Sequence, residues 1–140
     1  MKTIFLSYNG NDLAWAEWVG QEIEKKNAQV ILQHWDFAAG ANFVAKMHEA
    51  LQTCDKLAII LSRNYLSARF TNEEWQAAFA LRHRIIPFRI DNCEPPGLLA
   101  PIAYVDLFGQ TEEEARRRIA DALDPKDRRS RPVPFPGRRR

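Results

Sequence analysis

Five apolar residues stand in an unbroken row near the middle of the chain. The row is Leu57-Ala58-Ile59-Ile60-Leu61, and the polar Ser62 ends it. A strand without polar alternation is typical of a parallel sheet that is buried on both faces. Neighbouring parallel strands need long crossover connections, and these are usually helices. The row therefore predicts a buried parallel strand with helices on both faces of its sheet.

Segments with strand character alternate with amphipathic segments along the rest of the chain. Further strands are expected over residues 2–8, 29–35, 84–90 and 103–107. Between them apolar residues recur at helical spacing, and a last amphipathic helix is expected over residues 112–123. Five alternations predict an α/β, flavodoxin-like fold of three layers, with a five-stranded parallel sheet in the order 2-1-3-4-5.

Polar residues are expected to mark the ends of several elements. The segment Asn9-Gly10-Asn11-Asp12 after the first strand is expected to be a turn and N-cap cluster, and a simple cap of the first helix is one interpretation of Asp12. On that helix the tryptophans face inward, whereas Glu22 and other charged residues are expected on the outer face. A loop is expected through Tyr65 and Phe70, before a helix that opens at residues 71–74.

The charge of the chain is unevenly distributed. The 140 residues carry a net charge of +2, from 20 basic and 18 acidic residues. Residues 124–140 hold seven basic residues, two acidic residues and four of the eight prolines, which leaves residues 1–123 with a net charge of −3. A proline-rich, charged segment without apolar periodicity cannot bury enough surface to fold. We expect one folded domain over residues 1–123 and a flexible linker or tail over 124–140, which leads to a further domain of a longer protein.

Several classes of protein and site are disfavoured by the sequence. Its apolar runs are far shorter than the roughly 18 residues of a membrane span, and its start lacks the apolar core of a signal peptide. Two cysteines make no disulfide framework, and three scattered histidines predict no metal site. Nucleic-acid binding is not expected of the domain, because the basic charge belongs to the tail. We expect a cytoplasmic protein without a membrane partner.

The expected strand order also predicts where a ligand would bind. In this order the chain reverses direction between strands 1 and 3, and ligands bind outside the carboxyl ends of strands at such a point. Those ends hold Ser7 and Tyr8 on one strand and Ser62 on the other. The glycines form no dinucleotide-binding loop, and the strand ends lack the acidic residues of a response regulator.

Around these strand ends the sequence resembles the Toll/interleukin-1 receptor (TIR) domain family, and in particular its bacterial branch. The resemblance covers residues 2–123 and rests on three motifs in the expected order. They are Ile4-Phe5-Leu6-Ser7-Tyr8 with Asp12, then Trp35-Asp36-Phe37-Ala38-Ala39-Gly40, and then Leu61-Ser62 followed by Tyr65, Phe70, Glu74 and Trp75. One departure is Ala39, which replaces the proline that is usual before Gly40 and leaves that loop freer.

The resemblance implies enzymatic chemistry on a dinucleotide. Members of the family are either adaptor modules or enzymes that cleave nicotinamide from NAD+. The enzymes carry a glutamate on the third helix, which matches Glu74, and an aromatic residue four positions earlier, which matches Phe70. This implies an NAD+ glycohydrolase or cyclase with Glu74 as the catalytic residue, and with NAD+ as substrate and no required cofactor. The expected substrate-binding residues are Ser7, Tyr8, Trp35, Asp36, Ser62, Tyr65, Phe70 and Trp75.

The resemblance also implies that activity depends on assembly with other TIR domains. Sites in this family are often completed by a neighbour through the loop after the second strand, which would make Ala39 and Gly40 the interface loop here. Such self-association is expected in a signalling or bacterial defence protein, where a further module brings copies together and raises their effective concentration.

Two alternatives stay open. Thr71-Asn72-Glu73-Glu74 also fits a capping box, in which Glu74 only stabilises the start of its helix. Phe70 and Trp75 are then ordinary core residues. For the whole domain, the alternative is a non-catalytic signalling or scaffold module that acts through TIR–TIR interactions. The pair of Glu74 and Phe70 favours the enzyme, because an adaptor need not retain it.

Overall fold

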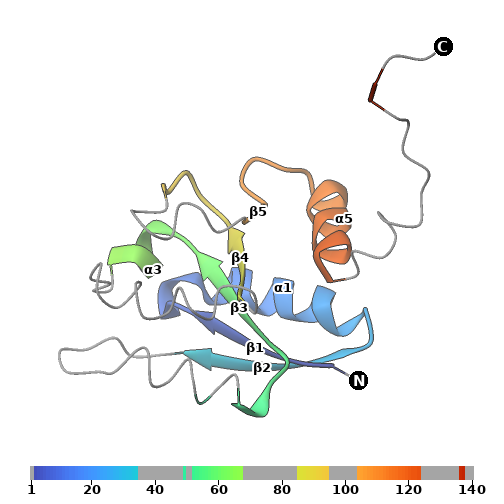
Figure 1. Cartoon of the computed structure of the whole chain (residues 1–140). Coiled ribbons are helices and arrows are strands. Elements are labelled where there is room, and N and C mark those ends of the chain that lie inside the picture. Colours follow the sequence, from blue (N-terminus) through green and yellow to red (C-terminus); the bar gives the residue numbers. More distant parts are fainter. Residues whose placement is uncertain are drawn as a thin grey trace.

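Five strands form one parallel sheet in the order β2-β1-β3-β4-β5 (Figure 1). The computed structural model describes residues 2–34, 49, 52–67, 85–94, 104–123, 136 and 137. The strands are β1 (Lys2–Tyr8), β2 (Ala28–His34), β3 (Lys56–Leu61), β4 (Ile85–Arg89) and β5 (Val105–Asp106). Their order and parallel direction confirm the prediction. The last strand has two residues and is shorter than the five expected.

The strand β1 lies between β2 and β3, and its register brings the carboxyl ends of β1 and β3 together. Ile4 pairs with Val30 on one side and with Lys56 on the other. Farther along the strand, Ser7 pairs with Ile59 of β3. Because parallel strands run in the same direction, the residues that follow β1 and β3 emerge at the same edge of the sheet.

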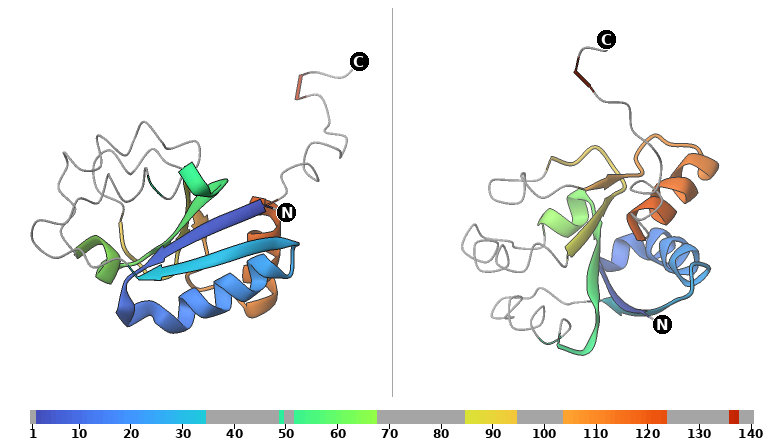
Figure 2. Two further views of the ribbon diagram at one scale, coloured as in Figure 1. Left: turned by 90° about the horizontal axis from the view of Figure 1, so that it is seen from below. Right: turned by 45° about the vertical axis from the view of Figure 1, so that its right-hand side comes forward.

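Helices cover the sheet on both sides. The helices α1 (Leu13–Glu24) and α5 (Glu112–Leu123) pack next to each other on one face. A short helix, α3 (Arg63–Ser67), begins at the carboxyl end of β3 on the other side of the sheet, as the right-hand view of Figure 2 shows. A single 3-10 turn, η1 (Gly10–Asp12), leads into α1. The loop expected through Tyr65 is therefore wrong in part, because residues 63–67 are helical.

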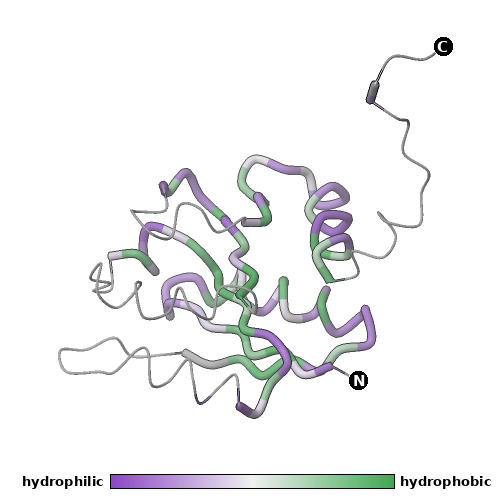
Figure 3. The backbone as a smooth tube through the Cα atoms, viewed as in Figure 1, coloured by the Kyte–Doolittle hydropathy of each residue, from purple (hydrophilic) through white to green (hydrophobic). Residues whose placement is uncertain are grey.

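The apolar row of β3 is buried on both faces of the sheet. Ala58 and Ile60 pack in the core beneath α1 and α5, where they meet Val19 and Ile119. Leu57, Ile59 and Leu61 alternate with them and are equally buried. Side chains of a strand alternate between its two faces, so both faces of β3 are covered. Figure 3 shows this hydrophobic centre, in contrast to the largely hydrophilic α5.

One charged residue of α1 is buried, contrary to the expectation of a solvent-facing position. Glu22 is only 3% exposed, and it accepts hydrogen bonds from Lys25 Nζ at 3.0 Å and from Arg116 Nε at 3.1 Å. Burial alone would raise the pKa of the Glu22 carboxyl, but the two cationic donors outweigh it and lower the pKa. The sequence of α1 could not reveal this position, because Arg116 comes from α5.

The charged surface of α5 agrees with its expected dipole and ion-pair pattern. Arg116 pairs with Glu112, and Arg118 pairs with Glu114, each across one helical turn. Arg117 also pairs with Glu114. The acidic first turn lies at the positive end of the helix dipole.

The described part of the chain contains no helix with the length and apolarity that a bilayer crossing needs. Cys54 and Cys93 are buried free thiols. Cys54 therefore occupies the small buried position expected of it.

Candidate functional site

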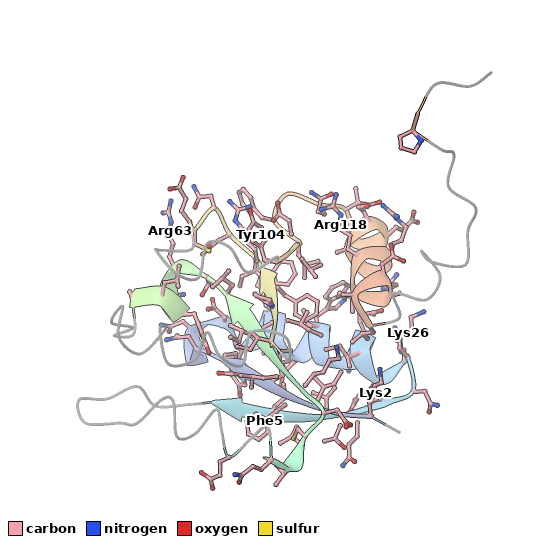
Figure 4. The ribbon with its side chains drawn as sticks, in the orientation of Figure 1. Lys2, Phe5, Lys26, Arg63, Tyr104 and Arg118 are labelled. Carbon is pink, nitrogen blue, oxygen red and sulfur yellow. The ribbon has the colours of Figure 1, made fainter. Side chains whose placement is uncertain are left out.

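A buried polar network lies at the carboxyl edge of β1 and β3, where the sequence predicts a ligand site. Ser7 at the end of β1 and Ser62 just after β3 are both fully buried. Figure 4 shows the neighbouring Arg63 at the opposite end of the sheet from Lys2, which begins β1. Buried hydroxyl groups require hydrogen-bond partners. Those partners come from the loop after β1 and from α3.

Ser7 is joined to α3 through Tyr65. The Ser7 Oγ and the phenol oxygen of Tyr65 are 2.9 Å apart. Burial raises the pKa of Tyr65 well above its ordinary value, so the phenol stays protonated at neutral pH. The bond fixes α3 against the end of β1 across 58 residues of sequence.

Ser62 joins α3 to the loop after β1. Its hydroxyl donates to Asp12 Oδ2 at 2.5 Å and accepts from the backbone N–H of Tyr65 at 3.0 Å. Asn64 Nδ2 donates to the other carboxylate oxygen of Asp12 at 3.2 Å. A hydrogen bond to a carboxylate is stronger than one between neutral groups. A continuous set of hydrogen bonds therefore connects the loop after β1 to the start of α3, through Asp12, Ser62, Asn64 and Tyr65.

The N-cap cluster expected over residues 9–12 does contain a cap, but the capping residue is not Asp12. Its side chain makes no capping hydrogen bond to α1. The residue that caps the turn is Asn9, whose side-chain oxygen accepts from the backbone N–H of Asn11 at 2.9 Å. The carboxylate of Asp12 is instead directed to Ser62 and Asn64. Short-range spacing favoured a cap, whereas the tertiary fold supplied donors about fifty residues away.

The loop after β4 also supports α3, through a residue that the sequence did not single out. Asp91 accepts from the backbone N–H of Arg63 at 3.0 Å and from that of Cys93 at 2.9 Å. The bond to Cys93, two residues on, is a common aspartate turn that could have been recognised locally. Burial and the nearby Asp91 carboxylate raise the pKa of the Cys93 thiol to about 11, so this thiol is not a nucleophile at neutral pH.

The predicted site residues fall into three groups. The structure brings Ser7, Ser62 and Tyr65 together in this network. Tyr8 belongs to the buried hydrophobic cluster that includes Ile4 and Leu6. The remaining predicted residues lie outside the described residues, namely Trp35, Asp36, Ala39, Gly40, Phe70, Glu74 and Trp75.

A separate hollow lies on the face of the sheet covered by α1 and α5. It measures about 370 Å³, and its walls include Trp15 and Trp18 of α1 and Thr111 before α5. None of the predicted site residues that the structure describes, namely Ser7, Tyr8, Ser62 and Tyr65, lines it. The described residues contain no group of three or more histidine, cysteine, aspartate or glutamate side chains that could hold a metal ion. The polar network therefore remains the candidate site.

Known proteins share both the sequence pattern and the fold. A relative from Aquimarina amphilecti, the 3′ cyclic ADP-D-ribose synthase AaTIR, is 27% identical over an alignment of 128 residues that covers 86% of this chain. The chain spans 39% of the length of that relative. Among solved structures, the TIR domain of the Toll-related receptor TRR-2 from Hydra magnipapillata superposes with a TM-score of 0.60 at 18% identity. That match covers 91% of this chain and 99% of the receptor domain.

The family assignment rests on the extent of the match along the chain. A family model described as the TIR domain matches residues 4–120, which include most of β1, the other four strands and most of α5. The superposition on the receptor domain agrees with it at the level of the fold. The chain therefore belongs to the TIR-domain family.

Proposed function

We propose that this TIR domain cleaves NAD+ to nicotinamide and ADP-ribose, or to a cyclic form of ADP-ribose, with Glu74 as the essential carboxylate. The main support is the relative from Aquimarina amphilecti, a 3′ cyclic ADP-D-ribose synthase that aligns with 86% of this chain. ADP-ribose is NAD+ without its nicotinamide. A product of that kind therefore requires the bond between nicotinamide and ribose to break.

The proposed reaction needs few catalytic groups. When the bond breaks, its electron pair leaves with nicotinamide, which departs as a neutral molecule and needs no general acid. The ribose is left with oxocarbenium-like positive charge, as in glycoside cleavage. A carboxylate held close to the ribose stabilises that charge, and more strongly where water is excluded. Water then adds to the ribose and loses a proton, or a hydroxyl group of the same molecule adds and gives a cyclic product.

The polar network supports this role through its position. Ser62, Asn64 and Tyr65 fix the start of α3 against β1, and the chain runs from α3 to Phe70 and Glu74 within ten residues of Asn64. In this proposal the network holds the near end of the segment that carries the carboxylate. Glu74 itself lies outside the described residues.

The other residues of the proposed site follow from the family resemblance. Ser7, Ser62 and Tyr65, whose side chains are fully buried, support the wall of the site from beneath in this proposal, and Trp35, Asp36, Phe70 and Trp75 line it around the substrate. Tyr8 is assigned to it as well, although its ring lies in the core beneath α1. Self-association through the loop of Ala39 and Gly40, a cytoplasmic location and a linker over residues 124–140 are parts of the same proposal.

Nicotinamide release tests the proposal directly. The concentrated protein is incubated with NAD+, and nicotinamide and the ADP-ribose products are separated by chromatography. Glu74→Gln is expected to lower the rate by about 100-fold or more, the usual effect of removing one electrostatic stabiliser. Glu73→Gln is the matched control, because it removes the same charge one residue away and should retain most of the activity.

Two outcomes would count against the proposal, one against the role of Glu74 and one against enzymatic activity. Full activity in Glu74→Gln would remove this residue from catalysis. No nicotinamide release by the folded wild-type protein, even at high concentration or with a crowding agent, would favour the non-catalytic TIR module. That module would still associate with other TIR domains.

A further inference from the structure

The outer strand of the sheet, β2, has one edge, the open edge, with which no other described strand pairs. β2 pairs with β1 over its full length, from Ala28 to His34. The strand order leaves its other edge without a strand partner among the described residues. Figure 2 shows β2 at the border of the sheet, beside α1. The unpaired N–H and C=O groups of such an edge are a template for another strand.

β2 lacks the features that usually keep edge strands from pairing. Natural edges are protected by charged side chains, prolines, bulges or short length. The seven residues of β2 include no charged residue, proline or glycine, and their register with β1 is continuous. Ile31 is 38% exposed and Leu32 is 40% exposed. Because successive side chains point to opposite faces, apolar surface is exposed on both faces of this edge.

The residue types of β2 are symmetric about Ile31. The sequence Gln29-Val30-Ile31-Leu32-Gln33 has an amide at each end and three aliphatic residues between them. In an antiparallel pair of identical strands centred on Ile31, Gln29 stands opposite Gln33 and Val30 stands opposite Leu32. Ile31 then stands opposite its own copy. Such a pairing is the same from either subunit, as a two-fold interface requires.

We propose that a second copy of this chain binds the open edge of β2 by antiparallel strand pairing centred on Ile31. The two five-stranded sheets then join across a two-fold axis. Backbone hydrogen bonds provide the attraction, and the matched aliphatic and amide positions select the register. The pairing uses none of the residues assigned to NAD+ cleavage, so it can fail without affecting the catalytic part of that proposal.

A hollow beside β2 fits this occupant. It measures about 360 Å³, and it is lined by Val30 and Leu32 of β2 and by Glu17, Gly20, Gln21 and Glu24 of α1. Directly opposite residues of an antiparallel pair share a face, so the partner's Val30 and Leu32 would cover this apolar floor. The acidic residues of the two α1 helices approach each other on that face. Salt screens this repulsion, and added salt should therefore tighten the dimer.

Sedimentation over a range of protein concentrations gives the first test. The wild-type chain is expected to form a dimer that tightens when sodium chloride is added. Ile31→Lys places two like charges directly opposite each other and should weaken the dimer by at least about tenfold. Leu13→Lys is the matched control, because Leu13 is 43% exposed and lies on α1 outside β2. Circular dichroism and thermal unfolding check that both variants fold.

Cysteine cross-linking gives the second test and reads the register. Cα atoms of directly opposite residues lie about 4.5–5.5 Å apart in an antiparallel pair, which a disulfide can bridge. Ile31→Cys should therefore form a disulfide-linked dimer under mild oxidation. Gln29→Cys should not, because the two copies of position 29 lie roughly 13 Å apart at this register. The wild-type chain, in which the native Cys54 and Cys93 are buried, gives the background level of disulfide-linked dimer.

The outcomes distinguish a second copy of this chain from a different protein as the partner that binds β2. Dimers that are lost in Ile31→Lys, retained in Leu13→Lys and cross-linked through position 31 alone support the proposal. A wild-type chain that stays monomeric at millimolar concentration overturns the proposal of strand pairing between two copies. The partner of β2 would then be a different protein. Equal weakening by both lysine variants, or equal cross-linking at positions 29 and 31, also overturns it.

Discussion

The hydroxyl of Ser62 donates a hydrogen bond of 2.5 Å to the carboxylate of Asp12, across fifty residues of sequence. The same hydroxyl accepts the backbone N–H of Tyr65, and the other oxygen of the carboxylate accepts from Asn64. This single pair therefore joins the loop after β1 to the first turn of α3. It also fixes where the chain leaves the sheet toward Glu74.

Removal of the Asp12 carboxylate should destabilise the fold. Asp12→Ala leaves the buried hydroxyl of Ser62 without its acceptor, and the expected loss is about 1–3 kcal/mol of unfolding free energy. Urea denaturation measures it. Asn11→Ala, at an exposed neighbouring position, is the control and should change stability by less than about 0.5 kcal/mol. Equal stability of Asp12→Ala and the wild type would show that the carboxylate has no structural role.

Ser7 and Tyr65 should be energetically coupled. Each of Ser7→Ala and Tyr65→Phe removes one partner of a fully buried hydrogen bond and should cost about 1–2 kcal/mol. The double variant should cost less than the sum of the two, by about 0.5–1.5 kcal/mol, because both changes remove the same hydrogen bond. Chemical denaturation of all four proteins gives the coupling. Strict additivity would contradict a direct bond between the two side chains.

The stability of the protein should fall in acid partly because of Glu22. Its pKa is lowered in the folded protein, by hydrogen bonds from Lys25 and Arg116 that outweigh the opposing effect of burial. This stabilisation is fully present above the ordinary pKa of glutamate, about 4.3, and is lost as the pH falls through the lower folded value.

The variant Glu22→Gln should therefore be less stable than the wild type at neutral pH and should approach it in stability in acid. Thermal unfolding from pH 7 to pH 3 measures this difference. Glu24→Gln, at an exposed position of the same helix, is the control. A stability difference between Glu22→Gln and the wild type that does not change with pH would refute the assignment.

Gly109 should be required for its backbone conformation and not for lack of space. Its φ angle is +74°, and a Cβ atom built there would have no neighbour within 4 Å. Gly109→Ala should therefore cost about 1 kcal/mol, because alanine disfavours this left-handed region. Gly109→Asn should cost less, because asparagine tolerates positive φ better. Equal losses in the two variants would point to another cause. Urea denaturation distinguishes these cases.

Much of the fold could be predicted from local sequence. The apolar row of β3 indicates a strand that is buried on both faces, and its side chains are buried on both. The periodicity of residues 112–123 predicts the bounds of α5. The hydrophobic periodicity and the helix-dipole pattern are properties of residues that are close in sequence, so both can be identified without the structure. The strand order followed from the alternation of strands and helices, and the TIR motifs agreed with it.

The partners of the polar side chains were decided by the tertiary structure alone. Asp12 has the spacing of a helix cap, but its donors are Ser62 and Asn64. Glu22 has the spacing of a surface residue, but α5 covers it and supplies Arg116. The sequence by itself determined the five strands and the helices α1 and α5, their order, and the edge at which Ser7 and Ser62 meet. Only the packed chain decided which donor meets which acceptor, because those pairs depend on contacts between segments that sequence spacing does not encode.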